Sequence, residues 1–410
     1  MTVRGTRHLL AATAALSLAG CAATIAPQPA AAPEPTVTLA TASAIPATTL
    51  APVTLPPTTL PPTTLPPTTL PPTTLPTPPR VSLAFTGDIV AHRAVNRYAA
   101  RPDGSYDYAG MFDNIAPLLQ SFDLAICHLE QPVSPDENVI IPPMQLSVAA
   151  QIAPAIAAAG YDRCSTASNH SLDRGTAGID ATVNALEAAG VGQSGMARRP
   201  EEVLPAVLTV NGVRIAHLSY TFSFNGLPPI PGEPWRSNLI DPERVIADAR
   251  AVRELGAEAV IVSFHWGVER GVQPTTEQRR VAEAVTASGA VNLIVGHHAH
   301  VLQPIEQVNG VWVIWGMGNV LSDHPTSSTW PAQSQDAAVF TTALQRNDDG
   351  SITVDRPVVY PTWCDTEAGY RIRLTSEADD PLAMINDSVR AQLRISRERT
   401  AAVLGNYLAP

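Results

Sequence analysis

The chain has 410 residues, a formal net charge of −11 at pH 7 and 39 prolines. The acidic balance argues against nucleic acid or an anionic surface as a main partner, because both would repel it. The length suits one large or two small domains.

The amino terminus has the pattern of a secretion signal. Arg4 and Arg7 precede an apolar run at residues 9–19, which is too short for a comfortable membrane span. The run closes on Leu-Ala-Gly-Cys, an order that resembles a bacterial lipoprotein signal. We therefore expect residues 1–20 to be a lipoprotein signal peptide and Cys21 to carry the lipid anchor. An ordinary secretory signal with an incidental cysteine is the alternative.

Residues 21–80 are predicted to be a disordered linker rich in proline and threonine. Leucine recurs every fifth residue from Leu55 to Leu75, and the first four of these leucines begin Leu-Pro-Pro-Thr-Thr units. Proline at this density prevents a packed core and favours extended polyproline II. We expect a stalk that lifts a domain off a membrane; a proline-rich recognition motif is the other interpretation.

From Val81 onwards, strand-like and helical patterns alternate. Buried strands are predicted at residues 81–86, 122–127, 161–167, 213–220, 259–264, 291–295 and 311–315. Helices are predicted from Asp88 through Tyr98, at 152–159, 177–189, 242–255 and 276–288, and once or twice within 379–407. This alternation predicts a layered α/β domain.

Three cysteines lie in this region. Outside the cytoplasm one disulfide is expected, which would leave one free thiol. Cys127 and Cys164 each close a strand-like run, so they are the favoured pair, with Cys364 left over.

Polar side chains gather where the strand-like runs end. They are Asp88, Glu130, Asn169, His170, His265, His298 and His300. Each alone has an ordinary explanation, such as a helix cap or a solvated loop carboxylate. Their joint placement is harder to explain by chance, because open α/β sheets bind ligands at this edge.

Residues 296–300 place three histidines in four positions directly after a strand. Neutral imidazoles are good metal ligands. His298 and His300 are the expected ligands, spaced as an alternating pair, while His297 would position the turn. Carboxylates, an amide and imidazoles suit manganese, zinc or iron, as one or two divalent ions, better than calcium or a thiolate-bound zinc.

Together these segments resemble the CapA family of poly-gamma-glutamate capsule biosynthesis proteins. The resemblance extends from Val81 to Leu374. It rests on Gly87-Asp88 with Arg93, Leu129-Glu130, Asn169-His170 with Asp173 and Gly175, His265-Trp266-Gly267 with Glu269, Gly296 to Val301 with Gln303, and Gly318-Asn319. It implies a calcineurin-like metallophosphoesterase fold, a layered α/β sandwich of mixed β-sheets flanked by helices, over residues 81–375. A helical extension would follow at 376–410.

The resemblance also implies roles for single residues. His170 would stabilise charge or protonate a leaving group, and Asp173 would orient it. Arg93 and Asn319 would contact substrate. The metal ligands would be Asp88, Glu130, Asn169, His265, His298 and His300.

The chain departs from the family pattern at several positions. His128 stands where the family usually has asparagine, so it is either an added ligand or a changed substrate contact. Ala299 replaces a usual proline, and the motif after Trp315 is altered. The aspartate-any-histidine opening of ordinary metallophosphoesterases is missing after Asp88, which disfavours simple phosphodiesterase activity.

The expected function is that of an extracytoplasmic, lipid-anchored, metal-dependent hydrolase or transferase in capsule or cell-envelope polymer biosynthesis. Its partners would be a polymer of the poly-gamma-glutamate type, the membrane and other capsule-synthesis proteins. An acidic polymer fits an acidic domain only if metal or Arg93, Arg174 and Arg270 provide local positive charge. The alternatives are a non-catalytic export or anchoring component and a metal-dependent phosphoesterase.

Overall fold

The computed structural model describes residues 78–136, 138–139 and 145–409. The predicted signal peptide, Cys21 and the predicted linker as far as residue 77 lie outside the described residues. Within the described part of the chain, no helix has both the length and the apolar character needed to cross a membrane.

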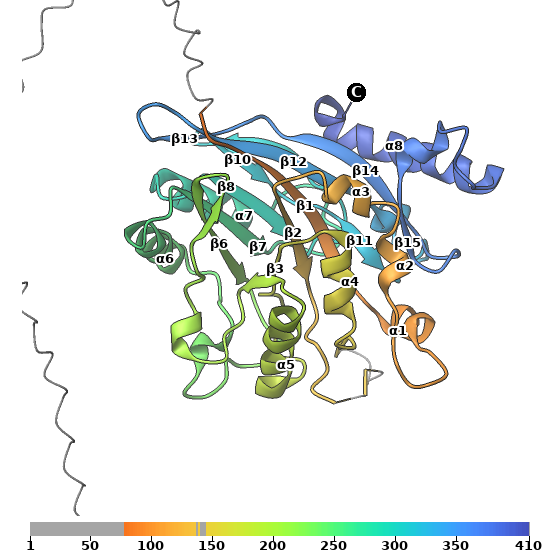
Figure 1. Ribbon diagram of the computed structural model, residues 1–410, viewed down its shortest axis with the longest axis horizontal. Coiled ribbons are helices and arrows are strands. Elements are labelled where there is room, and N and C mark those ends of the chain that lie inside the picture. Colours follow the sequence, from red (N-terminus) through yellow and green to blue (C-terminus); the bar gives the residue numbers. More distant parts are fainter. Residues whose placement is uncertain (1–77, 137, 140–144, 410) are drawn as a thin grey trace, which may run out of the picture. The chain divides into compact units, whose positions relative to one another are not determined.

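The first sheet is mixed and has the strand order β15-β14-β12-β1-β2-β3-β4, with β11 beside the end of β1 and β13 beside β12 (Figure 1). Its parallel part consists of β1 (Arg80–Val90), β2 (Leu124–Leu129), β3 (Arg163–Ser165), β4 (Gly192–Ser194) and β11 (Asn319–Ser322). Its antiparallel part consists of β12 (Asp336–Arg346), β13 (Ile352–Val354), β14 (Val358–Asp365) and β15 (Arg371–Leu374).

The second sheet has the order β5-β6-β7-β8-β10-β9. Its centre is parallel and consists of β6 (Val213–Thr221), β7 (Ala259–His265), β8 (Leu293–His297) and β10 (Val311–Ile314). Antiparallel strands β5 (Leu208–Val210) and β9 (Ile305–Val308) form its edges.

The two sheets pack face to face and helices cover both outer faces. Along β1, Leu83 and Phe85 enter a core shared with Ile215, Ile261 and Leu293 of the second sheet. Helices α1 (Arg93–Ala99), α2 (Ala109–Phe112), α3 (Ala116–Leu119), α4 (Ile152–Ala159) and α5 (Gly175–Ala188) lie on the side of the first sheet. Helices α6 (Pro242–Glu254) and α7 (Thr276–Ala287) cover the second sheet. The predicted layered α/β sandwich of mixed sheets flanked by helices is confirmed.

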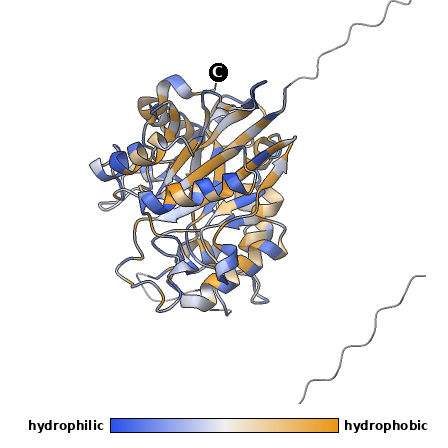
Figure 2. Ribbon diagram, turned by 90° about the vertical axis from the view of Figure 1, so that its left-hand side faces the viewer, coloured by the Kyte–Doolittle hydropathy of each residue, from blue (hydrophilic) through white to orange (hydrophobic). Residues whose placement is uncertain are grey.

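Hydropathy follows these layers. Apolar residues concentrate on the strands and polar residues on the outer faces of the helices (Figure 2). Helix α8 (Asp387–Leu404) packs on β12 and β14 of the first sheet. The layers leave the carboxyl ends of the parallel strands of both sheets at one edge of the sandwich.

One predicted helix starts too early, and several strands were not predicted. The helix expected from Asp88 begins only at Arg93, because Ile89 and Val90 continue β1 by pairing with β11. The strands that were not predicted are β4, β5, β9, β11 and β12 to β15, and the last four form the antiparallel part of the first sheet. Helix α4 matches its predicted range of 152–159.

The favoured disulfide is confirmed. Cys127 and Cys164 lie opposite each other on the parallel strands β2 and β3, with 4.4 Å between their Cα atoms, and are bonded. Cys364 is buried with a free thiol. The bond ties together two strands whose carboxyl ends carry predicted site residues.

Candidate metal centre

The ends of β1 and β8, which belong to different sheets, both pack closely against the segment at residues 315–318. A side chain at Gly87 would place its Cβ 2.0 Å from the Gly318 carbonyl oxygen, and one at Gly296 would lie 2.0 Å from that of Trp315. Only glycine fits at these two positions. The close approach brings Asp88 on β1 beside the histidines that follow β8.

Asp88 lies at the centre of the cluster and is fully buried. Its carboxylate accepts hydrogen bonds from His297 Nδ1, at 3.0 Å, and from the backbone N–H of His298, at 3.2 Å. His300 Nδ1 lies 3.2 Å from Asp88 Oδ2, the oxygen that also accepts from the His298 backbone. Burial alone would raise the pKa of Asp88, but the contacts with His297 and His300 hold it well below its usual value.

Six side chains form three overlapping groups whose potential ligand atoms lie within 4.8 Å of one another. The groups are Asp88, His128 and His297; His128, Glu130 and His265; and Asp88, Glu130 and His300. Four of these six residues are predicted ligands. His128, predicted to contact substrate, and His297, predicted to position the turn, also lie among them.

The other two predicted ligands, Asn169 and His298, border these groups. Asn169 Oδ1 lies 2.8 Å from His265 Nε2, and Asn169 Nδ2 donates to Asn225. The ring of His298 lies 4.8 Å from that of His265. His298 and His300 both have left-handed backbones, with φ of 86° and 56°. Such conformations are strained for residues other than glycine and cluster at functional sites.

Several buried polar atoms of the cluster lack a hydrogen-bond partner. They include both carboxylate oxygens of Glu130 and Nδ1 of His298. The nearest basic atom to Glu130 is His300 Nε2, 3.7 Å from Oε1. A buried carboxylate without hydrogen bonds is costly, and a bound cation would stabilise it. The donor set of carboxylates and imidazoles suits a divalent transition metal, so the residues fit such an ion.

The electrostatics of the cluster agree with that fit. Burial lowers the pKa of His128 and of His265 well below the usual value, so both rings are neutral. His128 Nε2 lies 2.9 Å from His265 Nδ1. Burial raises the pKa of Glu130 to about 7. Burial would also lower the pKa of His300, but Glu130 and Asp88 raise it to about 10. The His300 ring thus lies between two carboxylates, 3.2 Å from Asp88 and 3.7 Å from Glu130, where a cation would be stabilised.

His170 and Asp173 form a pair at the border of the cluster. His170 Nδ1 lies 2.6 Å from Asp173 Oδ2, and its Nε2 lies 4.0 Å from Glu130 Oε1. The backbone N–H of Leu146 also donates to Asp173, which fixes the carboxylate. The His170 side chain is 15% exposed. Its Nε2 is thus the atom directed at the cluster, as the predicted orienting role of Asp173 requires.

The predicted substrate contacts lie in different surroundings. Asn319 is fully buried, and its Oδ1 accepts from His300 Nδ1 at 2.8 Å. Arg93 is exposed at the first residue of α1, and no hydrogen bond or ion pair between described residues joins it to the cluster. Asn319 therefore positions a ring of the cluster, and the role of Arg93 as a substrate contact stays a prediction.

Two further histidines near the site were not predicted. His92 lies two residues beyond β1, and His324 lies two residues beyond β11. The other site residues were predicted because they follow the ends of strand-like runs. The same reasoning would have included His92 and His324 if the true ends of β1 and β11 had been known.

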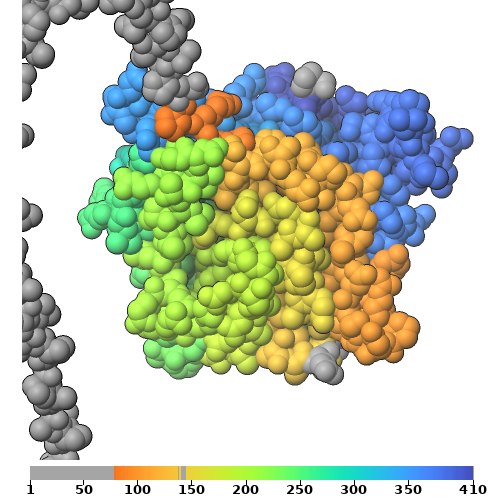
Figure 3. Space-filling view, viewed as in Figure 1, coloured from red at the N-terminus to blue at the C-terminus, as the bar shows by residue number. Residues whose placement is uncertain are grey.

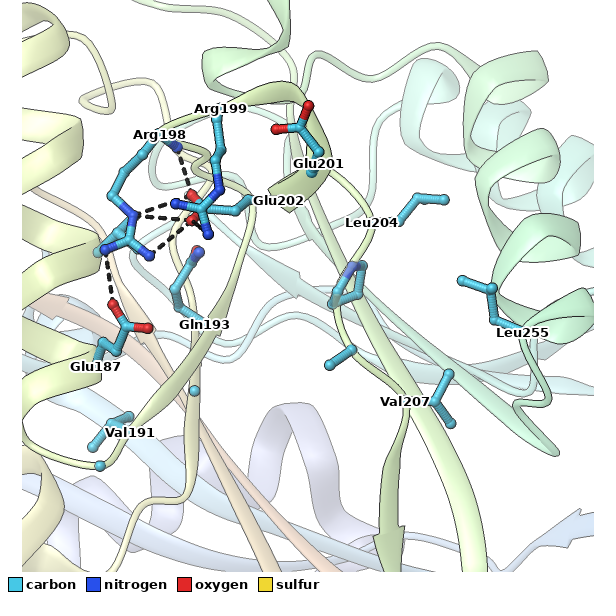
Figure 4. Close-up of a pocket in the computed structure, with 15 residues that line it drawn as sticks. Glu187, Val191, Gln193, Arg198, Arg199, Glu201, Glu202, Leu204, Val207 and Leu255 are labelled. Carbon is cyan, nitrogen blue, oxygen red and sulfur yellow. Dashed lines mark hydrogen bonds and ion pairs between the residues drawn. The ribbon is translucent and has the colours of Figure 1, made fainter. Parts of the chain in front are cut away.

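The described chain also has a hollow of about 740 Å³ between the edge strands β4 and β5, shown in Figure 4. Arg198 pairs there with Glu187 and Glu202, at 2.7 and 2.8 Å. Its lining includes none of the strand-end residues. On the face in Figure 3, the light-green segments that carry these residues lie beside the yellow α4 region.

Fold and site together define an α/β sandwich with a buried carboxylate–imidazole cluster at its strand ends. Residues 82–324 match the family model of the bacterial capsule synthesis protein PGA_cap. This match covers more than half of the chain, so the chain belongs to that family.

Two relatives agree with this assignment. The capsule biosynthesis protein CapA of Bacillus anthracis is 27% identical over 289 residues, which cover 67% of this chain and 66% of that protein. The PGA biosynthesis protein CapA of Bacillus subtilis is 26% identical over 287 residues, covering 67% and 70%. The chain thus spans about two thirds of the length of these relatives. The calcineurin-like phosphoesterase YfkN of Bacillus subtilis is similar in structure, with a TM-score of 0.42 and 15% identity over 79% of this chain and 98% of that one.

Proposed function

We propose that this chain is a metal-dependent enzyme of the cell surface that hydrolyses or transfers amide-linked glutamyl chains during assembly of a capsule or envelope polymer. Membership of the capsule synthesis family and the names of the relatives, which refer to capsule and PGA biosynthesis, support the polymer class. The carboxylate and imidazole groups at the strand ends support metal-dependent chemistry, and the His170–Asp173 pair supports proton transfer.

The observation that carries the proposal is the placement of His170. Its Nδ1 is held by Asp173 while its Nε2 lies 4.0 Å from Glu130. A histidine with only a packing role would have its second nitrogen paired within the core. This one directs an unbonded nitrogen to the border of a cluster that fits a metal, where a general acid or base is useful.

The ion is expected to be manganese, zinc or iron, as one ion or two. The side chains that would hold it are Asp88, His128, Glu130, His265, His297 and His300, with Asn169 and His298 beside them. Such an ion supplies Lewis acidity toward a carbonyl oxygen and an attacking water.

The chain's own residues supply the proton transfer. Cleavage of an amide requires a proton on the departing nitrogen, because an amide anion is a very poor leaving group. His170 takes a proton at Nε2 from the water that adds to the carbonyl carbon, and donates it to the departing nitrogen as the C–N bond breaks. Asp173 stabilises the imidazolium and keeps its Nδ1–H pointed away from the substrate. In a transfer reaction an amine or hydroxyl takes the place of the water.

The cell-surface location is a proposal from the signal pattern and Cys21. The disulfide between Cys127 and Cys164 supports it, because structural disulfides persist outside the reducing cytoplasm.

The test is a reaction of the purified metal-loaded protein with γ-linked glutamate oligomers, in parallel with phosphomonoesters and phosphodiesters. We expect cleavage or transfer of the oligomers, and a loss of about 10²–10⁴-fold in His170→Gln with unchanged metal content. Asp180→Asn, which alters an exposed partner of Arg236, is the control and should keep full activity. Turnover of phosphate esters alone would contradict the substrate class, and no turnover of any substrate would favour a non-catalytic role.

A further inference from the structure

Beside the cluster, four side chains from three segments of the chain form a continuous stack. The rings of His92 and His324 lie 4.2 Å apart, and Trp330 lies nearly flat on His324 at 3.6 Å. The guanidinium of Arg270 lies over the other end of the stack, 5.3 Å from the Trp330 ring centre. His300 adjoins the stack, with 5.2 Å between its ring and that of His324. The stack is therefore an extension of the candidate metal centre.

Both histidines of the stack are fixed as hydrogen-bond donors through Nε2. The backbone N–H of Asp323 donates to His92 Nδ1 at 3.2 Å, so the ring hydrogen of neutral His92 lies on Nε2. Asn319 Nδ2 lies 3.2 Å from His324 Nδ1 and donates to it. The orientation of the Asn319 amide is settled because Nδ2 also donates to the Ser334 carbonyl, at 3.0 Å.

Arg270 is held in place but has no acidic partner. Its backbone is left-handed, with φ of 62°, and its N–H donates to the Ala299 carbonyl at 2.7 Å. One guanidinium nitrogen donates to the Thr329 carbonyl at 2.9 Å. The ion pairs between described residues include Arg279 and Arg280 on α7 but not Arg270. Most of its five N–H donors thus remain available.

None of the ion pairs between described residues joins a carboxylate to His92, His324 or Arg270. Asp323 accepts from the Tyr370 hydroxyl at 3.1 Å, so that carboxylate is already engaged. Glu269 is exposed, and its charge acts on Glu130 in the cluster. His324 is only 6% exposed, so an anion that reached it would shed much of its water, and its hydrogen bonds would be strong.

We propose that His92, His324 and Arg270, aligned by Trp330, form a subsite that binds carboxylates of the substrate beside the metal centre. Donors placed in a row suit a polymer that carries a carboxylate on every unit better than they suit a single small anion. The subsite would also let a chain with a net charge of −11 hold an acidic polymer. This inference rests on the proposed function and specifies the chemistry that the site recognises.

The test is calorimetric titration of the metal-loaded chain with two probes: γ-linked pentaglutamate and the same oligomer with its α-carboxylates methylated. Arg270→Gln should bind the free acid about tenfold or more weakly, because a charge-assisted hydrogen bond is lost, and should bind the ester as the wild type does. His324→Phe keeps the stack and removes the donor, and should have the same selective effect. Arg280→Gln, an exposed change of equal charge, is the control and should bind both probes normally.

Equal loss of affinity for both oligomers, or equal loss in Arg280→Gln, would overturn the subsite. Competition by inorganic phosphate at similar affinity, abolished by Arg270→Gln, would overturn the carboxylate assignment. A wild type that binds the acid selectively but never cleaves or transfers it would contradict the proposed function and leave the subsite intact. Turnover of the oligomer with an unchanged KM in Arg270→Gln would support the proposed function and contradict the subsite.

Discussion

Single residues at the candidate site depend on backbone details that no sequence pattern carries. Strand-like runs followed by polar residues were enough to predict that Asp88, Glu130, His265 and His300 lie together at one edge of the sheets. Which rings face the centre depends on the left-handed backbones of His298 and His300. His128 lies inside β2 rather than beyond it, so its part in the cluster could not be assigned from its position at a strand end.

His217 on β6 gives a prediction at this scale about acid stability. It is buried, and its Nε2 lies 2.8 Å from Ser263 Oγ. Burial, and then the charge of Arg163, lower its pKa well below the usual value. In the unfolded chain His217 becomes protonated near pH 6.5, whereas in the folded chain it stays neutral at that pH. The contribution of neutral His217 to the free energy of unfolding is therefore present above pH 6.5 and is lost as the pH falls below it.

We expect the difference in unfolding free energy between wild type and His217→Gln to change by up to about 1.4 kcal/mol per pH unit below pH 6.5, with the wild type falling faster. Urea unfolding between pH 7.5 and 5 measures this, and the values at pH 7.5 are the internal reference. Parallel pH curves for the two proteins would contradict it.

At the scale of elements, local pattern predicted helices and parallel strands better than antiparallel ones. Helix α4 is marked by its apolar run and by Gly160, which ends it in a left-handed conformation. Strand β12 is buried on both faces over most of its length and so lacks the alternation that reveals a half-exposed strand. Its pairing with β1 joins segments far apart in sequence, and such pairing is not visible locally.

The attachment of α8 gives a prediction about stability. Arg399 on α8 makes two hydrogen bonds to Asp336, at 2.5 and 2.6 Å, and Ser396 adds a third. Asp336 is 1% exposed, so removal of Arg399 leaves a buried carboxylate without its charge partner. We expect Arg399→Met to lower the free energy of unfolding by about 3 kcal/mol.

Arg397→Met is the matched control, because its partner Asp379 is well exposed and the pair should contribute about 1 kcal/mol or less. Denaturant unfolding of both variants makes the comparison. Similar losses in the two would show that the buried pair does not hold α8.

At the scale of the whole molecule, the proposed arrangement is a metal-site domain carried on a stalk and anchored by lipid. The stalk is predicted from the proline- and threonine-rich composition of residues 21–80, and the anchor from the Leu-Ala-Gly-Cys order that ends at Cys21. We expect Cys21→Ser expressed in a bacterial host to move from the detergent phase to the aqueous phase of a partition experiment, with its metal content unchanged. A variant that stays in the detergent phase would contradict the lipid anchor.

The central claim is that the strand ends of the two sheets form a divalent metal centre, and its most direct test is elemental analysis of the protein purified without chelators. We predict one or two equivalents of manganese, zinc or iron per chain in the wild type, lost in Asp88→Ala and retained in Asp173→Asn, because Asp173 lies outside the three ligand groups. A metal-free wild type, or an Asp88→Ala variant that keeps its full metal content, would contradict the account.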